Sequence, residues 1–237
     1  MGALRVRLLV DTGVDDALAL VAAVLHPGLD LAEAVAVGGN VPLDRVLTNT
    51  RFVLGLLGAD TVPVTAGAAR RADGSAFQGR AVHGSDGLAG LAPHLPPAAV
   101  SSESDDTVSA ADAHGSDDDA LLVCLGPLTT LLGWTPAAVV ATYARPGQAN
   151  HALDPVAAER VRATWQVRDV RAGPDAVRLP GGRPRTDLGR FVAALLDHRA
   201  TRGVGLGDAD AVLRLAGETR PADTMAEQLR TWEGVRA

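Results

Sequence analysis

The chain has 237 residues, of which 47% are hydrophobic, so it is long enough to bury one sizeable core and short enough to form a single domain. The formal net charge of −6, with no basic run longer than the pair Arg70 and Arg71, argues against a nucleic-acid partner or an anionic membrane surface. The lone cysteine, Cys124, excludes an internal disulfide, and its apolar neighbours in "ALLVCLG" indicate a small buried side chain.

The N-terminal segment "MGALRVRLLVDTG" reaches Asp11 too soon to contain the apolar stretch of a signal peptide. Val6 stands where a myristoylation signal requires Ser or Thr. No apolar run approaches the roughly 20 residues that span a bilayer. We therefore expect a cytoplasmic protein with no membrane partner.

Apolar strands alternate with amphipathic helices through the first third of the chain, and the order predicts a parallel sheet. The predicted elements are a strand at 4–10, a helix at 15–27 closed by Pro27, a strand from 29 ending at Gly38, a helix at 46–58 and a strand at 62–68.

The second half continues with less regularity. Residues 101–119 are polar and acidic, which predicts a solvated loop or a poorly ordered helix. The remaining predictions are a buried strand at 120–126, a helix opening at 127–134, a helix at 154–165 with Pro155 in its first position, a turn at 178–185 and a helix at 186–200. We predict an α/β fold, an open, mostly parallel Rossmann-like sheet with helices on both faces, in one domain over residues 1–237.

Three carboxylates follow the first predicted strand, in "VDTGVDDALAL". Asp11, Asp15 and Asp16 repel one another unless a cation lies among them or one keeps its proton. Asp-Thr-Gly is also the signature of aspartic proteases, but those enzymes need two such loops on an all-β frame, and this chain has one before a helix. Calcium, which prefers oxygen ligands, is the stronger interpretation. The alternative is that acidic residues cap the helix or favour its dipole.

Further motifs follow in a fixed order, and together they resemble the inosine-uridine-preferring nucleoside hydrolase family over about four fifths of the chain. The segments that carry the resemblance are "VDTGVDDALAL", "VAVGGNVPLDRVLTNT", "VPVTAGAARR", "VHGSDGLAGL", "LVCLGPLTTL", "QANHALDPVAAERV" and "GLGDADAVL".

The resemblance implies a calcium-dependent enzyme that hydrolyses the N-glycosidic bond of ribonucleosides. By resemblance, calcium is held by Asp11, Asp16, Asp208 and the backbone carbonyl of Leu125, while Asp15 is the general base that deprotonates a water. Such a base and a positioned water suit an oxocarbenium-like transition state.

The substrate contacts also come from the resemblance. It places Asn40 and Asn150 on ribose hydroxyls, Gln148 on the 5′ side of the ribose and His83 near the pocket. Plain interpretations remain open: Asn40 is a turn residue after two glycines, Asn150 is a backbone cap, and Asp208 is the N-cap of the helix that follows.

Three residues and one segment depart from the family pattern. Leu9 replaces a carboxylate in the first strand, Gln148 replaces a glutamate, and Gly207 replaces the histidine beside the last aspartate. A deletion around 132–147 removes the segment that normally carries a central strand, which predicts exposed sheet edges. These departures leave a second function open, a catalytically impaired homologue that binds calcium or nucleoside without turnover. The resemblance also implies a homo-oligomer, a dimer or tetramer, with a small ribonucleoside as partner in purine and pyrimidine salvage.

Overall fold

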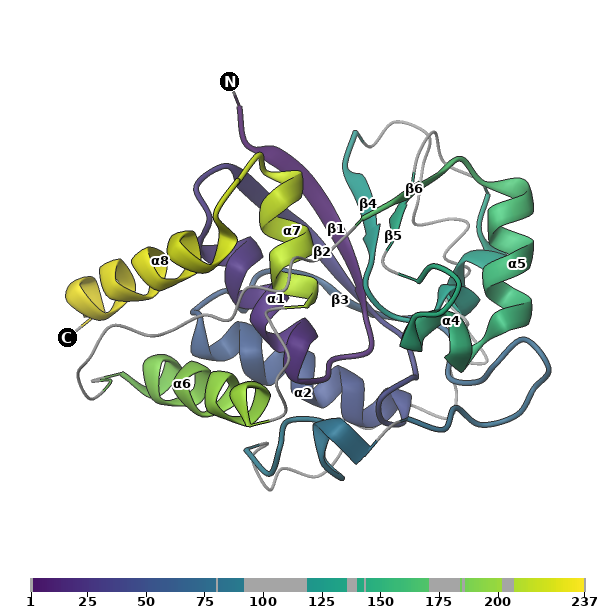
Figure 1. Cartoon of the computed structure of the whole chain (residues 1–237), viewed down its shortest axis with the longest axis horizontal. Helices are drawn as coiled ribbons and strands as arrows, with labels where there is room; N and C mark the ends of the chain where they lie inside the picture. The colour runs from purple at the N-terminus through teal and green to yellow at the C-terminus, as the bar shows by residue number, and fades with distance from the viewer. Residues whose placement is uncertain are drawn as a thin grey trace.

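Six parallel strands form one sheet in the order β3-β2-β1-β4-β5-β6 (Figure 1). The computed structural model describes residues 2–79, 81–91, 119–135, 140–142, 144–170, 184, 186–201 and 207–236. The strands are β1 (Leu4–Val10), β2 (Leu29–Ala36), β3 (Val64–Ala66), β4 (Leu121–Cys124), β5 (Val140–Thr142) and β6 (Val167–Asp169). The chain order reverses between β1 and β4, and ligands of such sheets bind beyond the carboxyl ends of the strands at that point.

Helices cover both faces of the sheet, as predicted (Figure 1). The α-helices are α1 (Val14–Leu25), α2 (Leu43–Leu56), α4 (Ala149–Leu153), α5 (Pro155–Thr164), α6 (Asp187–Ala200), α7 (Asp208–Leu215) and α8 (Pro221–Arg236), and the short 3-10 helices are η1 (Ala81–His83) and η2 (Leu128–Gly133). The larger core lies between the sheet and α1, α2, α6, α7 and α8, while η2 and α5 pack on the opposite face.

The alternation of side chains along β1 divides these two cores. Leu8 and Val10 are buried with α1, whereas Leu9 points to the other face and packs in the core that contains Trp165. The backbone carbonyl of Leu9 accepts the N–H of Leu125 at 2.8 Å. The side chain of Leu9 therefore serves as an apolar core residue, and its backbone carbonyl joins β1 to the adjoining end of β4. Cys124 is buried in the same core, as the sequence predicted.

The segment 132–147, where the deletion was expected to remove a central strand, contains β5. This strand pairs in parallel with both β4 and β6, and its three residues are buried. The prediction of exposed edges beside a lost strand was therefore wrong, because three residues suffice to continue the ladder. A helix begins within residues 127–134 as predicted, and η2 has 3-10 geometry.

The other predicted elements of the described chain are confirmed, with shifted ends. The predicted loop at 101–119 lies outside the described residues except for Asp119, and the turn at 178–185 does so except for Pro184. The sequence did not predict β6, α4 or α8. None of the helices in the described ranges is long and apolar enough to cross a membrane.

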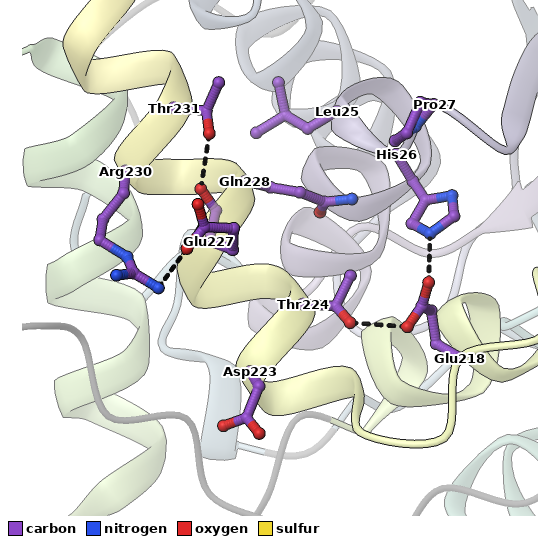
Figure 2. A pocket seen from close by; sticks show the side chains of 10 residues that line it. All are labelled: Leu25, His26, Pro27, Glu218, Asp223, Thr224, Glu227, Gln228, Arg230 and Thr231. Atoms are coloured by element: carbon purple, nitrogen blue, oxygen red, sulfur yellow. Dashed lines mark hydrogen bonds and ion pairs between the residues drawn. The ribbon is translucent and has the colours of Figure 1, made fainter.

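A groove of about 880 Å³ lies between the C-terminal end of α1 and α8 (Figure 2). There His26 Nδ1 accepts the N–H of Gly28 at 3.0 Å, so Nε2 carries the ring proton and donates to Glu218 at 3.0 Å. The hydrogen bonds from His26 and Thr224 lower the pKa of Glu218. These contacts fasten α8 to α1, and they lie about 15 Å along α1 from its N-terminal carboxylates.

Candidate metal centre and active site

Four aspartates meet at the carboxyl edge of the sheet. Asp11 follows β1 directly, Asp15 and Asp16 lie in the first turn of α1, and Asp208 is the first residue of α7. Because α7 packs against α1, a carboxylate from late in the chain lies beside those at its start. Asp11, Asp16 and Asp208 are at most 2% exposed. The predicted convergence of carboxylates is therefore present.

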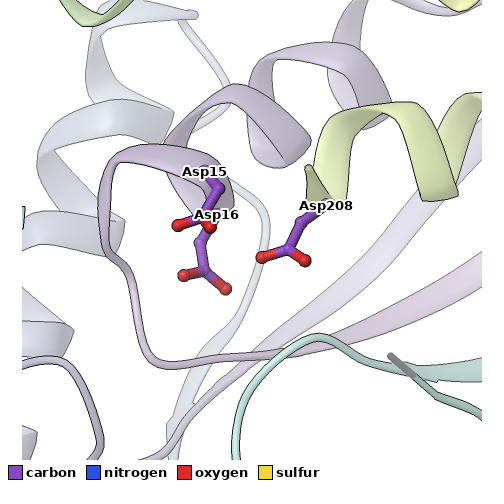
Figure 3. A group of neighbouring side chains, drawn as sticks. All are labelled: Asp15, Asp16 and Asp208. Atoms are coloured by element: carbon purple, nitrogen blue, oxygen red, sulfur yellow. The ribbon is translucent and has the colours of Figure 1, made fainter. Parts of the chain in front are cut away.

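The side chains of Asp15, Asp16 and Asp208 point toward one another (Figure 3). One carboxylate oxygen from each lies within 4.8 Å of the others, a spacing that one cation can bridge. Each of the three side chains also has a buried Oδ1 atom without a hydrogen-bond partner. Buried carboxylate oxygens without donors are costly, so the site needs positive charge or protons.

Burial and repulsion between the aspartates raise the pKa values of Asp11, Asp16 and Asp208. Burial, and then the charge of Asp15, raises the pKa of Asp11 to about 7. Burial is also the main cause that raises the pKa of Asp16 and of Asp208, with repulsion from the neighbouring aspartates second. Arg199 opposes the rise at Asp208. A cation with oxygen ligands would compete with these protons.

Helix capping accounts for only part of the cluster. Asp16 Oδ2 accepts the N–H of Gly13 at 3.0 Å and so caps α1, but Oδ1 is left without a partner. Asp208 is not the N-cap of α7, because that position belongs to Gly207. The interpretation of Asp208 as an N-cap was therefore wrong.

Two glycines make room for Asp11. A Cβ atom at Gly39 would lie 2.1 Å from Asp11 Oδ2, and one at Gly126 would lie 3.2 Å from Oδ1. Asp11 Oδ2 accepts the backbone N–H of Asn40 at 2.9 Å. The carboxylate is thus enclosed by the backbone that follows β2 and β4, so its position is set by the fold.

The substitution Gly39→Ala is expected to weaken calcium binding at least tenfold and to destabilise the protein by about 1–3 kcal/mol, because its Cβ would displace the Asp11 carboxylate. Calorimetric calcium titration and thermal unfolding measure the two effects. Gly133→Ala is the matched control, since a Cβ there meets nothing within 4 Å. Equal calcium affinity in both variants would show that Asp11 is not held in this way.

Asn40 and His83 converge above Gly13, at the start of α1. A Cβ atom on Gly13 would lie 2.5 Å from Asn40 Nδ2 and 2.6 Å from His83 Nδ1. The N–H of Val14 donates to His83 Nδ1 at 3.1 Å, so the ring proton is on Nε2. The 3.6 Å separation of Nδ1 from Asp15 Oδ1 is accordingly a close approach and not a hydrogen bond.

The remaining predicted residues lie on the β4 side. Leu125 follows β4, and its carbonyl accepts a hydrogen bond from Asn150 Nδ2 on α4. A carbonyl oxygen has a second lone pair, which remains for a ligand. Gln148 precedes α4, two residues before Asn150. Asn150 therefore contacts the Leu125 carbonyl, the backbone group that the sequence predicts as a calcium ligand. For Gln148, the structure gives its place at the start of α4, two residues before Asn150.

Arg199 was not predicted from the sequence. Its Nη1 lies 3.3 Å from Asp15 Oδ2, and its side chain is only 11% exposed. It stands in the last turn of α6, in no recognisable motif, so nothing in the sequence places it opposite a residue in α1. The signal that could have suggested it is indirect: buried carboxylates need a cation, and an arginine nearby in the fold supplies one.

A parallel sheet whose order reverses beside a buried carboxylate cluster defines an α/β protein with a candidate cation site at the carboxyl edge. The chain belongs to the inosine-uridine preferring nucleoside hydrolase family, whose model matches residues 7–134. The predicted family and fold class are therefore confirmed.

Relatives and solved structures agree with this assignment. An uncharacterised protein of Corynebacterium ammoniagenes is 40% identical over 85 residues, covering 36% of this chain and 92% of that protein. The pyrimidine-specific ribonucleoside hydrolase RihA of a Shewanella species (strain MR-4) is 35% identical over 124 residues, covering 51% of this chain but only 38% of RihA. The plant nucleoside hydrolase PpNRh1 has the same fold, with a TM-score of 0.68, 22% identity, and coverage of 90% of this chain and 78% of that one.

Proposed function

We propose that this protein hydrolyses the N-glycosidic bond of ribonucleosides and releases ribose and a free base, with calcium as its cofactor. The observation that carries the proposal is the buried cluster of aspartates with unpartnered oxygens at the carboxyl edge of a nucleoside hydrolase sheet. Oxygen-only donors that surround one point are the ligand set of a hard divalent cation. The named activity of RihA is consistent with this substrate class.

The ion would be held by the carboxylates of Asp11, Asp16 and Asp208 and by the carbonyl of Leu125. Calcium, when bound, would supply positive charge that orients two vicinal hydroxyls and lowers the pKa of a nearby water. Asp11 and Leu125 follow neighbouring strands, and Asp16 and Asp208 begin neighbouring helices. The donors therefore come from four rigid elements, which favours a fixed arrangement.

Asp15 is the residue to which we assign the general base. Its Oδ2 is held by Arg199, while its Oδ1 has no hydrogen-bond partner among the described residues. One oxygen is thus available to accept the proton of an attacking water, and the Asp15 side chain belongs to the same cluster as the proposed ligands Asp16 and Asp208. Asn40 lies next to Gly13, and Asn150 donates to the Leu125 carbonyl, so both are candidates to hold ribose hydroxyls. His83 also lies next to Gly13.

Release of free ribose from a panel of purine and pyrimidine ribonucleosides, measured with added calcium and with a chelator, tests this function. We expect release with calcium and loss of release with the chelator, and recovery when calcium is restored. Calorimetry on the same samples measures whether calcium binds. A folded protein that binds calcium without releasing ribose would be the impaired homologue that Gly207 and Gln148 left open. The oligomeric state and the cellular location stay predictions.

A further inference from the structure

A buried amide on α2 joins two loops of the candidate site. Asn49 is fully buried, and its Nδ2 donates to the Asp86 carbonyl at 2.8 Å and to the Thr12 carbonyl at 3.3 Å. Thr12 lies in the loop between β1 and α1, directly after Asp11. Asp86 lies three residues after His83. Because both partners are carbonyl oxygens, they fix the orientation of the amide, and each takes one of its two N–H groups.

The residue next to Asn49 adds a second contact to the first loop. Thr50 Oγ1 donates to the Val46 carbonyl at 2.8 Å, so at 2.6 Å it accepts the hydroxyl of Thr12. Asn49 Oδ1, in contrast, is buried without a hydrogen-bond partner among the described residues. Buried polar atoms in native proteins are nearly always paired, and an exception calls for an explanation. The explanation here is that the amide is present for the two loops that its N–H groups join.

The segment 83–90 is a compact turn whose parts move together. The carbonyl of His83 accepts the N–H of Ala89 at 2.8 Å. The carboxylate of Asp86 accepts the N–H groups of Leu88 and Gly90 at 3.0 and 2.9 Å. Leu88 is fully buried in the larger core. Because the turn is closed on itself, the hydrogen bond from Asn49 to the Asp86 carbonyl also fixes the backbone of His83.

The first residue of this turn faces the candidate substrate side of the site. The N–H of Val14 donates to His83 Nδ1 at 3.1 Å. A Cβ atom on Gly13 would lie 2.6 Å from that nitrogen and 2.5 Å from Asn40 Nδ2. His83 is therefore held twice, by its ring at the start of α1 and by its backbone through the contact with Asn49.

Two glycines of the turn differ only in what a side chain would meet. Gly87 has a φ of +82° and Gly90 a φ of +84°, conformations that other residues disfavour. A Cβ atom on Gly87 would lie 2.9 Å from Asn49 Nδ2 and 3.2 Å from the Thr12 carbonyl oxygen. A Cβ atom on Gly90 would meet nothing within 4 Å. Alanine at the two positions therefore separates damage to the Asn49 contacts from backbone strain.

We propose that Asn49 is a positioning residue that sets the place of His83 by joining the 83–90 turn to the loop before α1. This inference rests on the proposed function, in which the space beside His83 and Asn40 receives the ribose. Asn49 is fully buried, so it acts on the substrate through His83. The Asp11 carboxylate is held separately by the N–H of Asn40 at 2.9 Å, so calcium binding should depend little on Asn49.

A double-mutant cycle on kcat/KM for ribose release tests this role. Gly87→Ala and Asn49→Leu are each made alone and together with His83→Ala. Gly90→Ala is the matched control. We expect the two single variants to lower kcat/KM about 10- to 100-fold, the loss that follows when a substrate-positioning group is displaced. In the His83→Ala background the same substitutions are expected to cost about threefold or less, because the residue that they misplace is gone. Gly90→Ala is expected to keep the wild-type value.

An equal loss with and without His83 would overturn the inference, because a general structural role gives additive effects. An equal loss in Gly87→Ala and Gly90→Ala would overturn it too, since strain alone would then be the cause. So would a loss of calcium affinity, measured by calorimetry, as large as the loss of kcat/KM. Thermal unfolding shows whether each variant is folded, and Asn49→Leu carries the test if Gly87→Ala is not.

Amide hydrogen exchange of the 83–90 turn tests the contact without any activity. We expect exchange in this segment to become at least about tenfold faster in Gly87→Ala than in Gly90→Ala, because the turn loses its attachment to α2. Equal exchange in the two variants would overturn the role of Asn49 and leave the proposed function standing. A wild-type protein that releases no ribose would overturn the proposed function, whatever the exchange rates are.

Discussion

Asp15→Asn is expected to lower kcat for ribose release by about 10²–10⁴-fold, the range that a positioned general base contributes. Asparagine preserves the shape of the side chain and its contact with Arg199 through the amide oxygen, but it cannot take a proton from water. Calcium affinity is expected to change little, because Asp15 is not among the proposed ligands. Initial rates of ribose release and calorimetric calcium titration measure the two effects separately.

The matched control is Asp44→Asn. Asp44 occupies the same position in the first turn of α2 as Asp15 does in α1, so the control loses an equivalent favourable interaction with the helix dipole. We expect wild-type kcat from it. A large loss of calcium affinity in Asp15→Asn would instead make Asp15 a cation ligand, a role that its place in the three-carboxylate group permits on geometry alone.

Asp16→Asn is expected to weaken calcium binding about 100-fold or more and at the same time to raise the melting temperature of the metal-free protein. Asparagine replaces a fully buried carboxyl group whose charged form is disfavoured by burial and then by repulsion from Asp11, Asp208 and Asp15. The amide oxygen can still accept the N–H of Gly13, and the amide N–H groups can donate to the neighbouring carboxylates. A gain of 1–2 kcal/mol would raise the melting temperature by about 2–8 °C.

The pH dependence of unfolding supplies an independent check on this prediction. The pKa of Asp11 is about 7 in the folded state and near 4 when unfolded, so the folded metal-free protein binds more protons between these values. The stability from Asp11 is therefore fully present below about pH 4 and is lost as the pH rises to 7. We expect the metal-free protein to become more stable from pH 7 to 5. The gain is expected to be smaller in Asp16→Asn, because asparagine removes a second carboxyl group whose pKa is raised in the folded state. Saturating calcium should reverse the trend, since protons compete with the ion.

Asp16→Asn is expected to lower calcium affinity and to raise the melting temperature of the metal-free protein, and this combination distinguishes a cation ligand from a structural residue. A purely structural aspartate that caps α1 would destabilise the protein when altered, by about 1 kcal/mol, and would leave calcium binding unchanged. Asp187→Asn, in the first turn of α6, is the control for that outcome. A lower melting temperature in both variants, with equal calcium binding, would contradict the cation site.

The central strands and helices could be predicted because their signals are local. Buried runs such as β1 and β4, and the apolar periodicity of α1 and α6, are visible in single segments. The elements that escaped prediction are short or weakly patterned. Strands β5 and β6 have three residues each. Among the side chains that the structure describes in α8, the buried hydrophobic ones are Met225 and Leu229, a stripe too narrow to stand out.

The candidate site shows a different division. Residues after the strands, such as Asp11 and Asn40, could be placed together because parallel strands end at one edge of a sheet. Arg199 could not, because its meeting with Asp15 depends on how α6 packs against α1. In the sequence, Gly207 is only the absence of the histidine that the family has at this position. That Gly207 leaves room for the Arg199 side chain, eight positions earlier, is visible only in the structure.

The proposed cation ligands are drawn from most of the length of the chain, from Asp11 to Asp208. Closing so long a loop is costly in entropy and slow, so the complete ligand set forms only late in folding. An ion that binds this set would act as a removable cross-link between distant parts of the polypeptide. Calcium should consequently slow unfolding far more than it accelerates refolding, as for any interaction that is absent from the transition state.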